Sequence, residues 1–310
     1  MIAGAIDIGT NTTLALLAES ENGTLRPLRD QLTANGLGDA LLVEPVLSAE
    51  IIALNVDLLA EIARDFRREG AEDFVVAGTS ALRRARNRLD FLSAAKNVAG
   101  LHVDIISGRD EAALTYVGAV SNRDIYPNER VCVMDLGGGS TEIVQGNGWV
   151  PGPGYSADVG SSYLTNEFFL PPEPPAENDI HILRDYLQDM LPPLVNPLCG
   201  AAVPWILVGG TAVTLAILKA GLHRYEPEKI GGSELSKTDV EVLIQSFIGR
   251  SVDELQRLPG MPLGRGRTIL AGAILLDEMF SALNIEHGIV SERGLRHGLW
   301  LAKFGGREEI

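Results

Sequence analysis

The residues best suited to chemistry lie in two glycine-rich turns, each following an aspartate at the end of an apolar run. The first segment is Asp7–Asn11, Asp-Ile-Gly-Thr-Asn, and the second is Asp135–Glu142, Asp-Leu-Gly-Gly-Gly-Ser-Thr-Glu. Both are typical of a β-strand that runs into a tight turn, where glycines leave backbone N–H groups free to bind an anion. An aspartate at that point can face a divalent cation. We therefore predict one phosphate site built from two halves of the chain.

A third candidate is the stretch 82–88, which holds four arginines. We interpret Arg84 and Arg88 as part of a solvated helix face. Arg83 differs because it follows an apolar strand and the cap-like pair Thr79-Ser80, which places it near a helix N-terminus, where anions are favoured. Arg83 is therefore a candidate phosphate ligand.

The composition is that of an ordinary globular protein with two domains. The chain has 310 residues, of which 45% are hydrophobic and 22% charged. Its net charge of −15, from 26 basic and 41 acidic residues, argues against nucleic-acid and anionic-membrane partners. Neither a transmembrane run of roughly 18 apolar residues nor a signal-peptide pattern is found, so we predict a cytoplasmic protein.

The cysteines and histidines argue against a disulfide-stabilised protein and against a zinc protein. The two cysteines, Cys132 and Cys199, cannot form a disulfide framework, and the apolar neighbours of Cys132 predict a core position. The five histidines lack the spacing of metal ligands, so no zinc site is proposed.

The first half of the chain alternates strand and helix patterns after an initial meander. A helix over 48–70, with Ser48 as its N-cap, and a helix over 81–98 follow from apolar periodicity. Glu21–Gly23 is the expected hairpin turn of the meander. The predicted strands are 2–7, 14–18, 25–33, 74–78 and 103–106. This order resembles the ribonuclease H-like half-domain of actin and sugar kinases.

The second half repeats this pattern, although not the sequence. Its expected strands and helices are 131–135, 141–145, an extended piece at 155–159, helix 179–191, strand 205–208 and helix 212–220. Paired prolines make 171–178 a surface loop. Helix 266–283 is apolar on most sides, which predicts burial between domains or at a homodimer interface.

We therefore expect an α/β protein with two ribonuclease H-like (actin-like ATPase) domains facing each other across a cleft. Domain I is predicted to comprise 1–120 plus about 288–310, because the last helix crosses back, and domain II 121–287.

Four motifs in this order resemble the exopolyphosphatase/guanosine pentaphosphate phosphohydrolase (Ppx/GppA) family. They are Asp7–Asn11, Thr79–Arg83, Gly108–Ala112 and Asp135–Glu142. The similarity runs from residue 1 to about 303 and includes Gly209–Thr211 and the segment 266–273.

The resemblance implies magnesium-dependent hydrolysis of a terminal phosphoanhydride by water, with manganese as an alternative ion. Glu111 matches the family's base, which orients or deprotonates water. Asp110 either assists it or caps a helix. Asp135 and Glu142 match the carboxylates that face the metal, and Asp7 is expected to hold a water of the metal shell.

The same resemblance assigns the phosphate ligands. Gly137, Gly138, Ser140 and Thr141 would supply N–H and hydroxyl donors. Asn11 and Arg83 match positions that hold phosphates, although Asn11 could instead stabilise its turn. Gly209, Gly210 and Thr211 either line the phosphate path or allow close helix packing.

The chain also departs from the family pattern. An Arg-Leu-Gly segment usually follows the third strand, whereas this chain has Ala34–Gly38, with Asn35 or Gly36 in place of the arginine. One anionic contact would then be weaker or supplied elsewhere. The chain also lacks the helical C-terminal region of longer members, which favours shorter polyphosphates.

The leading prediction is an exopolyphosphatase that releases orthophosphate from inorganic polyphosphate. The nearest alternative is a guanosine pentaphosphate (pppGpp) 5′-phosphohydrolase, which would use the same residues. An ATP-dependent kinase of the same superfold and a non-catalytic sensor of polyphosphate or alarmone are the other classes. Substrate preference, chain-length preference, oligomeric state and the physiological ions stay open at this point.

Overall fold

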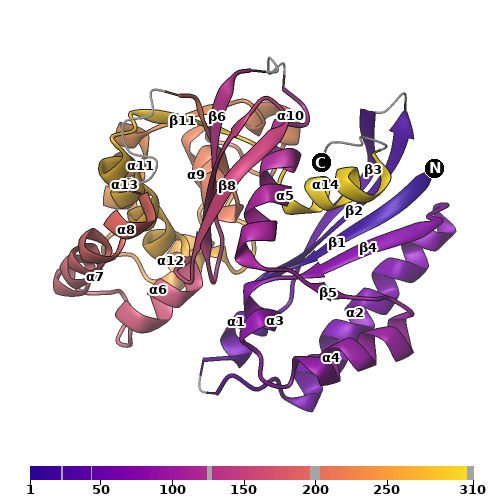
Figure 1. Cartoon of the computed structure of the whole chain (residues 1–310). Coiled ribbons are helices and arrows are strands. Elements are labelled where there is room, and N and C mark those ends of the chain that lie inside the picture. Colours follow the sequence, from indigo (N-terminus) through magenta and orange to yellow (C-terminus); the bar gives the residue numbers. More distant parts are fainter. Residues whose placement is uncertain (22–23, 43, 124–127, 196–202, 306–310) are drawn as a thin grey trace. The chain divides into compact units, whose positions relative to one another are not determined.

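The computed structural model describes residues 1–21, 24–42, 44–123, 128–195 and 203–305 (Figure 1). The chain divides into two compact units. Unit 1 comprises 1–125, 149–151 and 293–310, and unit 2 comprises 126–148 and 152–292. The predicted boundary at 287/288 falls earlier than the observed one at 292/293, because residues 287–290 form a strand of the unit 2 sheet.

Unit 1 is built on a five-stranded sheet in the order β3-β2-β1-β4-β5. The first three strands form the predicted antiparallel meander, and β4 and β5 then join β1 in parallel. Their bounds are β1 Ile2–Ile8, β2 Thr12–Glu21, β3 Thr24–Ala34, β4 Asp73–Gly78 and β5 Asp104–Ile105. The tip of the β2–β3 hairpin lies outside the described residues.

Helices cover both faces of this sheet because apolar side chains alternate along the strands. Helix α2 (Ala49–Arg68) packs against the face that carries Ile6 and Ile8. It begins as predicted, since Ser48 Oγ accepts a hydrogen bond from the Ile51 N–H. The C-terminal helix α14 (Leu295–Phe304) packs with α5 (Gly108–Val120) against the opposite face.

Helices α5 and α14 lie side by side (Figure 1), and two glycines allow their close approach. A Cβ on Gly118 would collide with the Gly294 carbonyl, and a Cβ on Gly298 would collide with the Leu114 carbonyl. Trp300 is fully buried, and its Nε1–H donates to the Ala3 carbonyl at 3.0 Å. The last helix is thereby fixed to the first strand.

The single helix predicted over 81–98 is wrong. The segment forms α3 (Ser80–Arg84), α4 (Arg88–Ala94) and a π-helical turn at Ala95–Ala99. Ala85 is extended, with ψ 119°, and the Arg86 N–H donates to the Pro45 carbonyl instead of continuing the helix. The four arginines therefore do not share one helix face.

Unit 2 contains a six-stranded sheet in the order β10-β11-β9-β6-β7-β8. Taken from β8, the first five strands repeat the order of unit 1, which bears out the predicted duplication of architecture. The bounds are β6 Arg130–Leu136, β7 Thr141–Asn147, β8 Val150–Ala157, β9 Trp205–Val208, β10 Glu234–Ser236 and β11 His287–Val290. Strand β8 begins earlier than the predicted piece at 155–159.

Helix α13 (Ile269–Leu283) lies at the centre of unit 2. Nearly all its residues are buried, against helices of the same unit. Its apolar character therefore needs neither a second domain nor a second subunit. The other unit 2 helices of eight or more residues are α6 Ser161–Phe168, α7 Glu177–Met190, α9 Gly210–Lys219 and α11 Lys237–Phe247.

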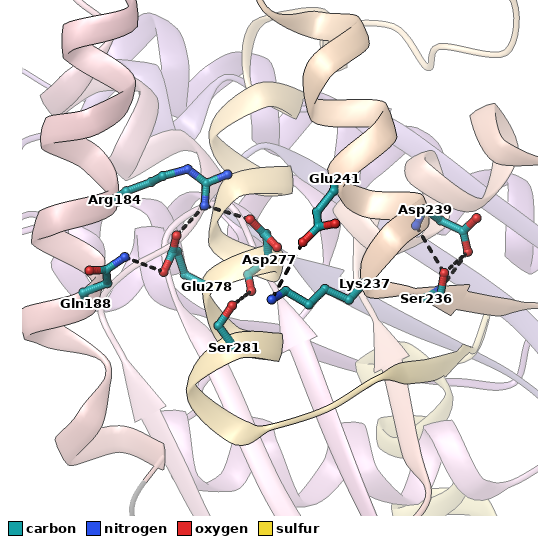
Figure 2. Close-up of polar contacts among 9 residues, drawn as sticks. All are labelled: Arg184, Gln188, Ser236, Lys237, Asp239, Glu241, Asp277, Glu278 and Ser281. Atoms are coloured by element: carbon teal, nitrogen blue, oxygen red, sulfur yellow. Dashed lines mark hydrogen bonds and ion pairs between the residues drawn. The ribbon is translucent and has the colours of Figure 1, made fainter.

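Four polar side chains, two from each helix, fix α13 to α7 (Figure 2). Arg184 of α7 pairs with both Asp277, at 2.7 Å, and Glu278, and the hydrogen bonds to the two carboxylates raise its pKa against the opposing effect of burial. Gln188 donates to the second oxygen of Glu278 at 3.2 Å. These contacts hold two helices of the unit 2 core in register.

The predicted core position of Cys132 is confirmed. Cys132 is fully buried, and burial raises its pKa to about 12, so it is an inert core residue. No described helix combines the length and the apolar character needed to span a bilayer. Cys199 lies outside the described residues.

Candidate functional site

The turn after β1 is held by its carbonyl groups. The Gly9 carbonyl accepts from Asn35 Nδ2 at 2.9 Å, the Thr10 carbonyl from the Gly38 N–H at 2.7 Å and the Asn11 carbonyl from the Asn35 N–H at 3.0 Å. Because C=O and N–H point in opposite directions across a peptide, the N–H groups that follow these carbonyls face the other way. Fixing these three carbonyls fixes the orientation of the peptide groups that form the turn, which is the kind of rigid backbone that an anion site uses.

The carbonyls of the turn after β6 are also held by hydrogen bonds, here from the first residues of a helix. The N–H groups of Ser161 and Ser162, at the start of α6, donate to the carbonyls of Gly137 (3.0 Å) and Gly138 (2.8 Å). This satisfies donors that a helix N-terminus otherwise leaves unpaired. A Cβ on Gly160 would lie 2.6 Å from the Gly138 carbonyl oxygen, so only glycine permits the contact.

The opposite side of this turn is free to bind a ligand. Among the described residues, the N–H groups of Gly138, Gly139 and Ser140 donate to no protein acceptor. Thr141 is buried, and its Oγ1 donates to the Val159 carbonyl at 2.6 Å. In this structure its hydroxyl serves the fold.

The turn brings together the two predicted metal-facing carboxylates of unit 2. Asp135 and Glu142 are directly opposite each other in the β6–β7 register, so their side chains share one face of the sheet. Glu142 is buried, and its Oε1 accepts from Ser156 Oγ at 2.8 Å.

This carboxylate pair fits Mg²⁺, which commonly takes one or two carboxylates and keeps several waters. The described residues contain no group of three or more histidine, cysteine, aspartate or glutamate side chains that could form a metal cage. An ion held by these two carboxylates would keep waters at its remaining coordination positions.

The third glycine turn, at Gly209–Thr211, packs against Asp135. Gly209 has φ 94°, and its Cβ position would lie 2.5 Å from Asp135 Oδ1. Gly210 packs directly under the guanidinium of Arg265, where any side chain would collide with it. Thr211 is buried, and its Oγ1 lies 2.7 Å from where a Cβ of Gly272 would be. Close packing by glycine is thus evident at this turn.

Arg265 is a residue that the sequence analysis missed. Burial lowers its pKa, and the negative charge of Asp135 opposes that effect. The arginine therefore lies close enough to Asp135 to interact with its charge. The only signal in the sequence is its position one residue before the family-like segment at 266–273.

Unit 1 holds the predicted base at a helix N-terminus. Glu111 lies in the first turn of α5 and is 8% exposed. Arg83 Nη1 donates to Glu111 Oε2 at 2.5 Å and to the Ile106 carbonyl at 3.1 Å. Arg83 Nη2 is buried and has no hydrogen-bond partner among the described residues, so this nitrogen could donate to a further acceptor.

Two further acidic residues, Asp110 and Asp7, were considered for the site, and their contacts are as follows. Asp110 accepts from Ser107 Oγ at 2.7 Å, and Ser107 Oγ accepts from the Asp110 N–H at 3.2 Å. This reciprocal cap favours the helix-capping interpretation of Asp110. Asp7 is half-buried near the end of β1, between Leu14 and Ala77 of its neighbouring strands.

The predicted site residues thus divide between the units. Unit 1 carries four of them, and each lies at the end of a strand or the start of a helix. They are Asp7, Asn11, Arg83 and Glu111. Unit 2 carries the others, in the two glycine turns and the carboxylate pair. They are Asp135, Gly137, Gly138, Ser140, Thr141, Glu142, Gly209, Gly210 and Thr211.

Two units with the same ribonuclease H-like strand order, each with a glycine turn after its first strand, define an α/β protein of the actin-like superfold. Comparison with known proteins gives the family directly. The sequence profile of the Ppx/GppA phosphatase family matches residues 16–305, and the chain belongs to that family.

Named relatives span almost the whole chain. Exopolyphosphatase 2 of Mycobacterium tuberculosis is 30% identical over 97% of this chain and 98% of its own length. A guanosine-5'-triphosphate,3'-diphosphate pyrophosphatase of Photobacterium profundum is 27% identical over 95% of this chain and 58% of its own length. The crystal structure of the Aquifex aeolicus family member has a TM-score of 0.84 at 27% identity, with 98% of this chain and 97% of the other covered.

Proposed function

We propose that this protein is an exopolyphosphatase, which hydrolyses the terminal phosphoanhydride of inorganic polyphosphate and releases orthophosphate. The observation that carries the proposal is the turn 137–140, where three N–H groups without an acceptor in the described part of the chain adjoin the Asp135–Glu142 carboxylate pair. Such a turn can bind phosphate oxygens, and two adjacent carboxylates can hold the cation that accompanies them. Family membership and the exopolyphosphatase relative support the same activity.

In this proposal Glu111 is the base that orients or deprotonates the attacking water. Phosphoryl transfer to water asks the protein mainly for positioning and charge neutralisation. The carboxylate is nearly excluded from solvent and is held by Arg83, so its direction is well defined. Arg83 Nη2 would take a phosphate oxygen, in line with the predicted phosphate role of this arginine.

Asp135 and Glu142 would hold Mg²⁺, with Asp7 as a candidate ligand to a metal-bound water. A bound magnesium ion would neutralise phosphate charge and so favour attack by water. The N–H groups of residues 138–140 would position the same phosphate group. Asn11, Gly209 and Gly210 remain proposed phosphate contacts, and manganese is the alternative ion.

Three substrates test this function in one experiment. Orthophosphate release is measured with Mg²⁺ from polyphosphates of defined length, from pppGpp and from ATP, each with wild type and Glu111→Gln. Faster turnover of polyphosphate, lost in the variant, is the expected result. A strong preference for pppGpp would replace the proposal with the pentaphosphate phosphohydrolase, the second candidate, which the Photobacterium relative favours.

The kinase alternative gives a different outcome in the same assay. Transfer of phosphate from ATP to an acceptor, without loss in Glu111→Gln, would support it.

We also propose a cytoplasmic location, testable by cell fractionation. A homodimer stays a prediction, and light scattering would test it.

A further inference from the structure

We propose that Asn35 is a positioning residue that shapes the first phosphate turn. The inference rests on the proposed function and concerns a side chain to which no role was assigned. Asn35 is 2% exposed and directly follows β3, in the segment that departs from the family's Arg-Leu-Gly pattern. It reaches two of the three carbonyls that define the turn at 9–11.

The contacts of Asn35 require both a donor and an acceptor on one short side chain. Its Nδ2 donates to the Gly9 carbonyl at 2.9 Å, while its Oδ1 accepts from the Leu37 N–H at 3.1 Å. The backbone N–H of Asn35 also donates to the Asn11 carbonyl at 3.0 Å. Aspartate could accept from Leu37 but could not donate to Gly9, and leucine could do neither. An asparagine amide meets both needs.

A second buried amide holds Asn35 itself. Asn55 of α2 is 1% exposed, and its Nδ2 donates to the Asn35 carbonyl at 3.0 Å and to the Ile51 carbonyl at 2.9 Å. The turn is thus tied through Asn35 to one of the longest helices of unit 1. Since unpaired buried polar groups are costly, this chain of bonds gives the turn one conformation.

Close packing behind the turn completes the support. The Gly38 N–H donates to the Thr10 carbonyl at 2.7 Å, and a Cβ on Gly38 would lie 2.7 Å from Thr10 Cγ2. Gly36, by contrast, has open space around its Cβ position. The segment that lacks the family's arginine therefore serves the turn through Asn35 and Gly38.

The consequence for function is that the N–H groups of this turn are directed by Asn35. When the amide is lost, the carbonyl of Gly9 no longer has its partner and the turn can rotate. Binding of the polyphosphate chain should then weaken while the Arg83–Glu111 pair is unaffected.

The test uses Asn35→Asp and Asn35→Leu in the full-length enzyme. A matched control is Asn87→Leu, because Asn87 makes the same type of paired contact with the backbone of Leu47, at 2.9 Å in each direction, away from the turn. Steady-state kinetics with tripolyphosphate and Mg²⁺ should give a KM raised about tenfold or more in both Asn35 variants. The kcat should change less than threefold, and Asn87→Leu should leave KM unchanged.

Amide hydrogen exchange supplies a second readout that does not depend on activity. Exchange in a peptide covering residues 9–13 should quicken in Asn35→Asp relative to wild type and should not change in Asn87→Leu. If KM and exchange in this peptide both match wild type, the inference is wrong. If wild type does not turn over polyphosphate but the exchange difference remains, the proposed function fails while the positioning role stands.

Discussion

Arg83 and Glu111 form a close ion pair, with Arg83 Nη1 2.5 Å from Glu111 Oε2, and it joins α3 to the first turn of α5. The Ile106 carbonyl accepts from the same Nη1, so this nitrogen is held by two acceptors. The pair links a predicted phosphate ligand to the predicted base. Substitutions of the two residues should therefore differ in their effect on KM.

Glu111→Gln should lower kcat by about 10²-fold or more, because it removes the base and keeps the shape of the side chain. KM should change little, since no phosphate contact is removed. Steady-state kinetics on polyphosphate check this. Turnover within a few-fold of wild type would mean that Glu111 is the wrong residue.

Arg83→Ala should weaken polyphosphate binding and also lower kcat, because Glu111 loses the group that orients it. The KM effect should diminish at high salt, as expected for a charge-assisted contact. Arg84→Ala is the matched control, since Arg84 is an exposed arginine of the same helix. An unchanged KM in Arg83→Ala would count against the phosphate role.

Asp135→Asn should raise the Mg²⁺ concentration needed for activity by about tenfold or more, because it removes one of two adjacent carboxylates. In wild type, Mg²⁺ should also raise the Tm through preferential binding to the folded state, and this shift should shrink in the variant. Differential scanning fluorimetry across a Mg²⁺ titration measures both. The exposed Asp253→Asn should behave as wild type.

Gly160→Ala should displace the turn at 137–140, because the alanine Cβ would lie 2.6 Å from the Gly138 carbonyl oxygen. We expect a loss of activity of at least about tenfold, with a decrease in stability of about 1–3 kcal/mol. Ser161→Ala keeps the N–H that binds Gly137 and should change activity far less. Equal activities of the two variants would show that the turn tolerates displacement.

His297→Asn should make the stability of the protein less sensitive to acid. Burial, with the positive charges of Arg296 and Arg293, lowers the pKa of His297 well below its usual value. A histidine of this kind contributes its full stability above the unfolded pKa of about 6.5, and the contribution is lost as pH falls below that value. Between pH 7.5 and 5.5 the loss should be on the order of 1 kcal/mol.

Urea unfolding at the two pH values measures this loss. Because other groups also titrate in this range, the difference between wild type and His297→Asn is the relevant quantity. Parallel decreases in the two proteins would contradict the buried neutral state of this histidine.

The sequence alone determined the order of the elements and most of the chemical groups. Ser48 as a helix cap, the meander and the strand 205–208 follow from local periodicity and capping, which act over a few residues. The glycine turns are recognisable for the same reason, since their composition reflects local backbone needs.

Only the tertiary structure decided which groups support those turns. The contact of Arg86 with Pro45 interrupts a helix that periodicity predicts as continuous, and burial of α13 inside one unit removes the reason for a subunit interface. Asn35 contacts Gly9, which is 26 positions away in the sequence. Arg265 packs on Gly210, which is 55 positions away. Such contacts arise when distant strands and helices pack, so no local pattern records them.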